Sequence, residues 1–213
     1  RMNQREREFP SREDEVRQGR EPFSTARRQE RACRVGVHIA DPGRAGAMDI
    51  IEQAARLLAQ FRLQGLPTVH IQHLATRPGA TFFLPNTPGA EIHPCVQPLA
   101  GETILQKHFP NSFRETALLE HLHSLGCQRL VICGMMTHMC IDATSRAAAD
   151  LGFSCLLAHD ACATRALAFD DQHVPARQVH AAFLAALRGT YAQVLSVDEI
   201  LAEMRKDANT WIS

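Results

Sequence analysis

Hydrophobic residues alternate along this chain between short continuous runs and helical spacing, beginning near Val35. The continuous runs predict strands over residues 35–40, 68–74, 102–107, 129–134, 153–161 and 192–197. The helical spacing predicts helices over residues 49–64, 113–125, 140–150 and 175–187. Ser196 to Glu199 has the spacing of a capping box for a final short helix. This alternation predicts an α/β fold with three α/β/α layers around a mostly parallel central sheet.

The first 34 residues do not follow this pattern. They hold 17 of the 46 charged side chains and almost no aliphatic residue before Val35. Such a segment cannot bury enough apolar surface to offset the entropy of ordering. We therefore expect a charged, disordered N-terminal tail over residues 1–33 and one domain over residues 34–213. Acidic residues interleave with the arginines of the tail, which argues against a nucleic-acid-binding arm.

The overall composition is typical of a globular protein. Hydrophobic residues make up 45% of the chain, and 23 basic residues balance 23 acidic ones. This balance gives no general attraction to nucleic acid or to an anionic membrane. No apolar run reaches the ~20 residues needed to span a bilayer, and the charged start lacks the apolar region of a secretory signal. We expect a cytoplasmic protein that binds neither nucleic acid nor membrane.

The seven cysteines show no CxxC spacing. Cys133, Cys155 and Cys162 lie in or beside apolar runs, as reduced intracellular cysteines do when they act as small buried hydrophobes. The odd count and the spacing favour neither a disulfide framework nor a zinc site. His70 and His73 are candidate metal ligands, but an i, i+3 pair on a strand points to opposite faces of the sheet. We therefore expect no metal.

Three segments that follow predicted strands are candidates for a site, because ligands bind beyond the carboxyl ends of parallel strands. They contain Asp41, Lys107 and the run from Gly134 to Cys140. A cysteine where a helix begins is favoured as a thiolate, the nucleophilic form, by the helix dipole and by unpaired backbone N–H groups. The alternatives are that Cys140 is one more small core residue and that Lys107 is a solvated lysine at the end of a strand.

Several motifs in the same order resemble the isochorismatase-like cysteine hydrolase family. The main one is GMMTHMCIDATSRAAADLGF (134–153), which is followed by HDACAT. PNTPGAEIHPCVQP (85–98), QKHFPNSFRETAL (106–118) and the C-terminal VHAAFLAAL and VLSVDEIL also fit. The resemblance spans about residues 49–206 and implies a Rossmann-like topology and a hydrolase activity.

The resemblance also implies roles for particular residues. Cys140 would be the nucleophile, Lys107 the cation beside it, and Asp41 the general base, although the glutamine that follows the family aspartate by two positions is missing here. It further implies a cis peptide bond between Met135 and Met136, and an oxyanion hole formed by the backbone N–H groups of Met136 and Cys140. Candidates for the substrate pocket are Phe82, Phe83, Phe113 and His138.

We expect the chain to hydrolyse a small amide, or a related C–N or ester-like bond, through a covalent cysteine thioester and without a cofactor. One alternative is cleavage of a vinyl ether, as in an isochorismatase proper, which needs no cysteine nucleophile. Another is a catalytically impaired family member that acts as a binding or scaffold protein. The expected partners are a small-molecule substrate and further copies of the chain, in a dimer or tetramer.

Overall fold

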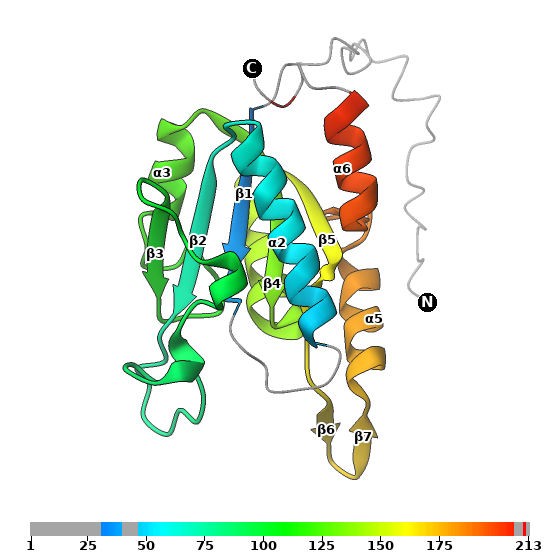
Figure 1. The fold of residues 1–213 in the computed structure, drawn as a ribbon. Coiled ribbons are helices and arrows are strands. Elements are labelled where there is room, and N and C mark those ends of the chain that lie inside the picture. The colour runs from blue at the N-terminus through cyan, green and yellow to red at the C-terminus, as the bar shows by residue number, and fades with distance from the viewer. Residues whose placement is uncertain (1–30, 40–46, 207–210, 212–213) are drawn as a thin grey trace, which may run out of the picture.

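Six parallel strands form the central sheet of the computed structural model, which describes residues 31–39, 47–206 and 211. The strand order is β3-β2-β1-β4-β5-β8, and Figure 1 labels β1 to β5. Their bounds are β1 (Arg31–Val37), β2 (Thr68–His73), β3 (Thr103–Lys107), β4 (Cys127–Met135), β5 (Ser154–Ala163) and β8 (Gln193–Leu195). The predicted parallel sheet is therefore confirmed.

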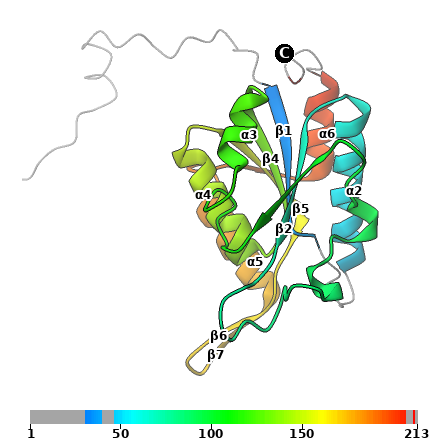
Figure 2. The ribbon, with the colours of Figure 1, turned by 90° about the vertical axis from the view of Figure 1, so that its left-hand side faces the viewer.

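Helices cover both faces of this sheet (Figure 2). On one face, α2 (Ala47–Leu63) and α6 (Val197–Lys206) bury an apolar core that includes Phe61 and Met204. On the other face, α3 (Leu118–Ser124), α4 (Asp142–Asp150) and α5 (Ala176–Leu187) bury a second core. The predicted three layers are confirmed. No helix among the described residues combines the length and the apolar character needed to cross a membrane.

The first strand starts earlier than its apolar run predicts. Arg31 of β1 pairs with Cys127 of β4, so residues 31–33, expected in the tail, belong to the sheet. The Arg31 side chain donates a hydrogen bond to the backbone oxygen of Leu125 at 2.9 Å. A strand that pairs with a neighbour along its whole length can therefore include charged residues at its start. The rest of the expected tail, residues 1–30, lies outside the described residues.

A disulfide joins Cys33 of β1 to Cys127 of β4, although the count and spacing of the cysteines favoured no disulfide framework. The two residues are 94 positions apart in sequence, but their Cα atoms are 6.0 Å apart because β1 and β4 are neighbours in the sheet. Sequence spacing could not reveal this pair. The free cysteines among the described residues are Cys95, Cys133, Cys140, Cys155 and Cys162.

Connections between the main elements differ most from the sequence-based prediction. Helix α3 begins at Leu118 rather than at residue 113, because Thr116 Oγ1 donates to the Ser112 backbone oxygen at 2.6 Å in a preceding turn. The hairpin of β6 (Leu167–Phe169) and β7 (Gln172–Val174) was not predicted. The long loop between β2 and β3 contains two short 3₁₀ helices, η1 (Pro88–Ala90) and η2 (Pro94–Val96). This loop supplies part of the pocket at the carboxyl ends of the strands.

Candidate active site

The carboxyl ends of the central strands bring four chemically active side chains to one end of the sheet. His38 directly follows β1, His73 ends β2, and Lys107 ends β3. Cys140 lies in the π-helical turn η3 (Thr137–Ile141), shortly after the end of β4. Parallel strands place their carboxyl ends at a common edge, so side chains far apart in sequence meet there.

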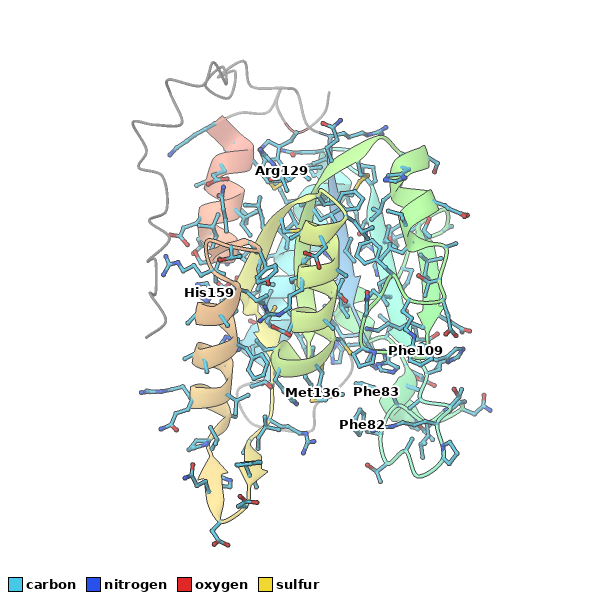
Figure 3. The ribbon with its side chains drawn as sticks, turned by 180° about the vertical axis from the view of Figure 1, so that it is seen from behind. Phe82, Phe83, Phe109, Arg129, Met136 and His159 are labelled. Carbon is cyan, nitrogen blue, oxygen red and sulfur yellow. A yellow bond between two sulfur atoms is a disulfide. The ribbon has the colours of Figure 1, made fainter. Side chains whose placement is uncertain are left out.

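Aromatic residues lie near the same end of the molecule (Figure 3). Phe82, Phe83, Phe109 and Met136 are labelled around the ends of the strands, whereas Arg129 lies at the opposite end of the sheet. The aromatic side chains come from the loops that follow β2 and β3.

The turn that carries Cys140 is fixed by backbone contacts. The backbone N–H groups of Met139 and Ile141 donate to the Met136 oxygen at 3.0 and 3.2 Å, and Thr137 Oγ1 donates to the Ala163 oxygen at 3.2 Å. The Met135–Met136 peptide bond is cis, at the position that the resemblance implied.

Gly134 allows β4 to approach the end of β1 closely. Its φ is +126°, and a Cβ atom there would lie 1.8 Å from the Val37 backbone oxygen. Neither the conformation nor the space admits a side chain at this position. Glycine is therefore required just before the turn that carries Cys140.

Cys140 is 1% exposed and contacts a histidine. Its Sγ lies 3.4 Å from Nδ1 of His73, which is itself buried. Burial lowers the pKa of His73 to about 4, and the charge of Lys107 acts in the same direction, while a hydrogen bond with the His108 backbone opposes them. His73 is therefore a neutral imidazole at pH 7.

Lys107 is fully buried beside the same cysteine. Its Nζ donates to the Pro110 backbone oxygen at 2.6 Å. Burial lowers the pKa of the Lys107 ammonium, and its interaction with Cys140 raises it in part. A cation held in this way would stabilise a thiolate on Cys140.

His38 forms a second buried contact around His73. Its Nδ1 accepts the backbone N–H of His73 at 3.0 Å, and its Nε2 lies 3.4 Å from the Gly89 oxygen. These contacts fit a neutral ring with its proton on Nε2. Burial is the main cause that lowers the pKa of His38 to about 4. Its backbone φ of +29° is unusual for a residue other than glycine.

The structure brings together two of the three predicted catalytic residues. Cys140 and Lys107 lie side by side, whereas Asp41 lies outside the described residues. Sequence reasoning missed His38 and considered His73 only as a metal ligand. The rule that pointed to Lys107 could have found His73, because Lys107 ends its predicted strand and His73 lies one residue before the end of another.

A pocket of about 400 Å³ opens beside this cluster. Its walls come from the loops after β2 and β3 and from Met139, with His73 at the boundary to Cys140. Arg77 is the charged side chain of the lining, and Phe82 and Phe109 supply aromatic surface. A largely apolar pocket with a few polar groups is the usual form of a small-molecule site.

The four predicted pocket residues lie in different places. Phe82 lines the pocket. Phe83 is buried, with its ring centroid 4.0 Å from that of His38 and 5.3 Å from that of His73. Phe113 stacks on Phe153 at 6.1 Å, and His138 hydrogen-bonds to Thr164. Of the four, Phe82 faces this pocket and Phe83 supports the histidines beside it.

His70 and His73 point to opposite faces of the sheet, as their spacing predicts. His70 Nε2 lies 2.9 Å from Glu102 Oε2, while His73 contacts Cys140 on the other side. Within the described part of the chain, no group of three or more His, Cys, Asp or Glu side chains is arranged to hold a metal ion.

Comparison with known proteins identifies the class of protein that this fold and site define. A model of the family described as Isochorismatase domain matches residues 29–199. The chain therefore belongs to the isochorismatase family and is a hydrolase of that family. The match begins before Arg31, in agreement with the early start of β1.

Individual relatives agree with this assignment. Isochorismatase family protein YddQ of Bacillus subtilis (strain 168) is 50% identical over 150 residues, which cover 70% of this chain and 83% of YddQ. Maleamate amidohydrolase of Pseudomonas putida (strain KT2440) is 30% identical over 133 residues, covering 56% of this chain and 62% of that enzyme. A crystal structure from Oleispira antarctica, assigned to the isochorismatase hydrolases, has a TM-score of 0.76 at 46% identity and covers 82% of this chain and 98% of its own.

Proposed function

We propose that this chain is a cysteine hydrolase that cleaves a small amide, or a related C–N or ester-like bond, through a thioester on Cys140. The observation that carries the proposal is the position of the Cys140 sulfur. It lies beside a buried lysine and a neutral histidine, and that histidine lines a small-molecule pocket. A cysteine in such surroundings is a nucleophile rather than an inert core residue.

The proposed reaction has two halves. The thiol proton leaves Sγ, the sulfur bonds to the carbonyl carbon, and the backbone N–H groups of Met136 and Cys140 stabilise the oxyanion. The C–N bond breaks as the leaving nitrogen takes up a proton, which leaves an acyl thioester on Cys140. Water then adds to the thioester carbonyl, the C–S bond breaks, and a carboxylic acid and the free thiol result. Asp41 is the proton acceptor that the family resemblance suggests.

The relatives support amide cleavage over cleavage of a vinyl ether. Maleamate amidohydrolase is an amide-cleaving enzyme by its name, and this chain is similar to it. The cysteine beside Lys107 also supports this choice, because vinyl-ether hydrolysis needs no such nucleophile.

A test uses p-nitrophenyl acetate, an activated ester that reports formation and hydrolysis of an acyl-cysteine. We expect Cys140→Ala to reduce p-nitrophenol release to near the uncatalysed rate, because the cysteine beside Lys107 that would form the thioester is removed. The matched control is Cys95→Ala, which removes an exposed free cysteine and should leave the rate within about threefold of the parent. A Cys140→Ala variant that keeps the parental rate, or a parent protein without any Cys140-dependent release, would contradict the proposal.

A further inference from the structure

Strand β3 forms one edge of the central sheet and has no neighbour on its outer side among the described residues. It pairs only with β2, over the register from Val69 with Thr103 to His73 with Lys107. Figure 1 shows it at the outer margin of the sheet. An unpaired strand edge offers backbone N–H and C=O groups to a further strand, so natural proteins usually protect such edges.

The pairing with β2 shows which backbone groups of β3 are free. The Leu74 N–H donates to the Lys107 oxygen at 2.9 Å, so the backbone polar groups of Lys107 face β2. These groups alternate in direction from residue to residue along a strand, so those of Ile104 and Gln106 point away from the sheet. Both residues are exposed, Ile104 by 50%. The free donors and acceptors are therefore placed symmetrically about Leu105.

The usual protections of an edge strand are missing from β3. Its sequence TILQK contains no proline, its register with β2 runs without a shift, and its one charged residue, Lys107, is buried. The other edge of the sheet differs, because β8 has only the three residues Gln193–Leu195. A very short edge strand is itself a form of protection. Of the two edges, β3 is therefore the one suited to accept another strand.

We propose that β3 pairs with β3 of a second copy of this chain, antiparallel about a twofold axis at Leu105. In this register, Ile104 lies opposite Gln106 of the partner subunit, and the two residues exchange their N–H···O bonds. The twofold axis repeats this pair on the other side of Leu105. The two central sheets then form one continuous sheet, which is the antiparallel form of strand addition.

The side chains near the axis suit a copy of the same strand. Leu105 is partly buried and packs against the apolar core on the side of α3, and its counterpart extends that core across the axis. The half-exposed Ile104 is covered by the aliphatic part of the partner's Gln106. A twofold contact also closes, because it uses the free edge of both copies, whereas a head-to-tail contact would leave one edge open.

The charges at the ends of the pairing are compatible with this register. Glu102, just before β3, falls opposite the partner's His108, just after it. The Glu102 carboxylate is already paired with the Arg62 guanidinium at 2.7 Å. No like charges therefore face each other along the paired strands, which a like-charge pair directly opposite would destabilise.

The first test measures the mass of the full chain in solution by sedimentation velocity between about 5 and 200 µM, because a contact of this size is small for a stable interface. We expect a dimer in the parent whose fraction rises with concentration. Ile104→Pro removes an outward N–H and no bond to β2, so it should fold and remain monomeric over this range. Circular dichroism checks the fold.

The matched control is Phe169→Ser, which removes an apolar side chain of 76% exposure from the β6–β7 hairpin rather than from β3. It should keep the parental dimer, which separates strand pairing from general association of apolar surface. A parent that stays monomeric, a folded Ile104→Pro protein that dimerises like the parent, or loss of the dimer in Phe169→Ser alone would overturn the proposal.

Cysteine cross-linking tests the register without a proline. In a Cys95→Ala background, which lacks the exposed free cysteine, Leu105→Cys places two sulfurs at the axis, where opposite Cα atoms lie about 4.5 Å apart. Gln106→Cys separates the Cα atoms by about 9 Å, too far for a disulfide. Mild oxidation should cross-link Leu105→Cys and leave Gln106→Cys largely monomeric on a non-reducing gel.

No cross-linked dimer with Leu105→Cys, or at least as much with Gln106→Cys, would overturn the proposed pairing. None of these measurements needs turnover, so the inference does not rest on the proposed function. A failure of thioester chemistry in Cys140→Ala and a failure of β3 pairing are therefore distinguishable.

Discussion

At the scale of single residues, Lys107 lies in a buried position that a role beside Cys140 explains. The side chain is fully buried, and a buried ammonium is costly unless it is paired. It has one strong acceptor, the Pro110 oxygen at 2.6 Å, and the sulfur of Cys140 beside it. This arrangement suits a cation whose second partner becomes an anion during the reaction.

We predict that Lys107→Met lowers the turnover of p-nitrophenyl acetate at pH 7 by about 10²-fold or more, because the thiolate and oxyanion lose their nearest cation. Stopped-flow release of p-nitrophenol measures the effect. The control is Lys206→Met, which removes the second of the chain's two lysines at the exposed end of α6. Equal loss in both variants would contradict a specific role for Lys107.

Sequence reasoning reached Cys140 and Lys107 because each follows or ends a strand and carries reactive chemistry. It could not reach the contact between His38 and His73, because that contact depends on how β1 and β2 end beside each other. The disulfide of Cys33 and Cys127 was missed for a similar reason. Pairings between strands distant in sequence are decided by register, which single-residue patterns do not contain.

At the scale of elements, the start of α6 is fixed by the predicted capping box. The Ser196 backbone N–H donates to Glu199 Oε2 at 2.7 Å, and the Glu199 backbone N–H donates to Ser196 Oγ at 3.2 Å. Asp160 Oδ1 accepts a further bond from the Val197 N–H at 2.8 Å. These bonds satisfy N–H groups that a helix start would otherwise leave unpaired.

We predict that Ser196→Ala lowers the free energy of unfolding by about 1 kcal/mol, measured by urea denaturation. Ser154→Ala serves as the control, because this exposed serine lies at the start of a strand and should change stability little. A Ser196→Ala variant as stable as the parent would show that Asp160 alone suffices to cap the helix.

Strand β1 contains a buried cation, Arg34, that has few hydrogen-bond partners. Arg34 is fully buried, and its Nη1 donates to Thr68 Oγ1 at 3.2 Å. Its Nε and Nη2 have no partner among the described residues. Gly36 makes room for it, because a Cβ atom there would lie 2.8 Å from the guanidinium.

We predict that Arg34→Met raises the free energy of unfolding by about 1–3 kcal/mol, because it replaces an unpaired buried charge by an apolar side chain of similar length. Urea denaturation at pH 7 measures the change. A loss of stability would instead mean that water or an anion satisfies the guanidinium in solution.

At the scale of the whole molecule, burial of several histidines makes stability depend on pH. Burial lowers the pKa of His38, His70 and His73 to about 4 each. In the unfolded chain these groups titrate near 6.5, so between about pH 4 and 6.5 the unfolded state binds more protons. The stability present at pH 7 is therefore lost as the pH falls through this window.

We predict that the free energy of unfolding at pH 5 is lower than at pH 7 by several kcal/mol at most, as an order of magnitude. Glu102 affects stability at a lower pH than the histidines do. The Arg62 side chain lowers the pKa of this carboxyl to about 2, so its contribution to the free energy of unfolding is lost only as the pH falls below about 4.5. Urea denaturation across the pH range measures the slope. Equal stability at pH 5 and pH 7 would contradict the burial of the three histidines.

The overall topology was predictable because each strand and helix repeats a strong pattern of apolar residues, as in β4 and α2. The β6–β7 hairpin was not, because its strands have three residues each and Phe169 is exposed, so no apolar periodicity marks them. The pocket depends on loops between strands. Their shape follows from tertiary contacts that short-range patterns do not encode.

The most direct test of the central claim is to locate the acyl group during hydrolysis of p-nitrophenyl acetate. Samples quenched with acid at early times are digested, and the acetylated peptide is identified by mass spectrometry. We predict an acetyl group on Cys140 that forms with the release of p-nitrophenol and then disappears as acetate is produced. Continued turnover with the acetyl group on Cys95, or with none on Cys140, would contradict the account.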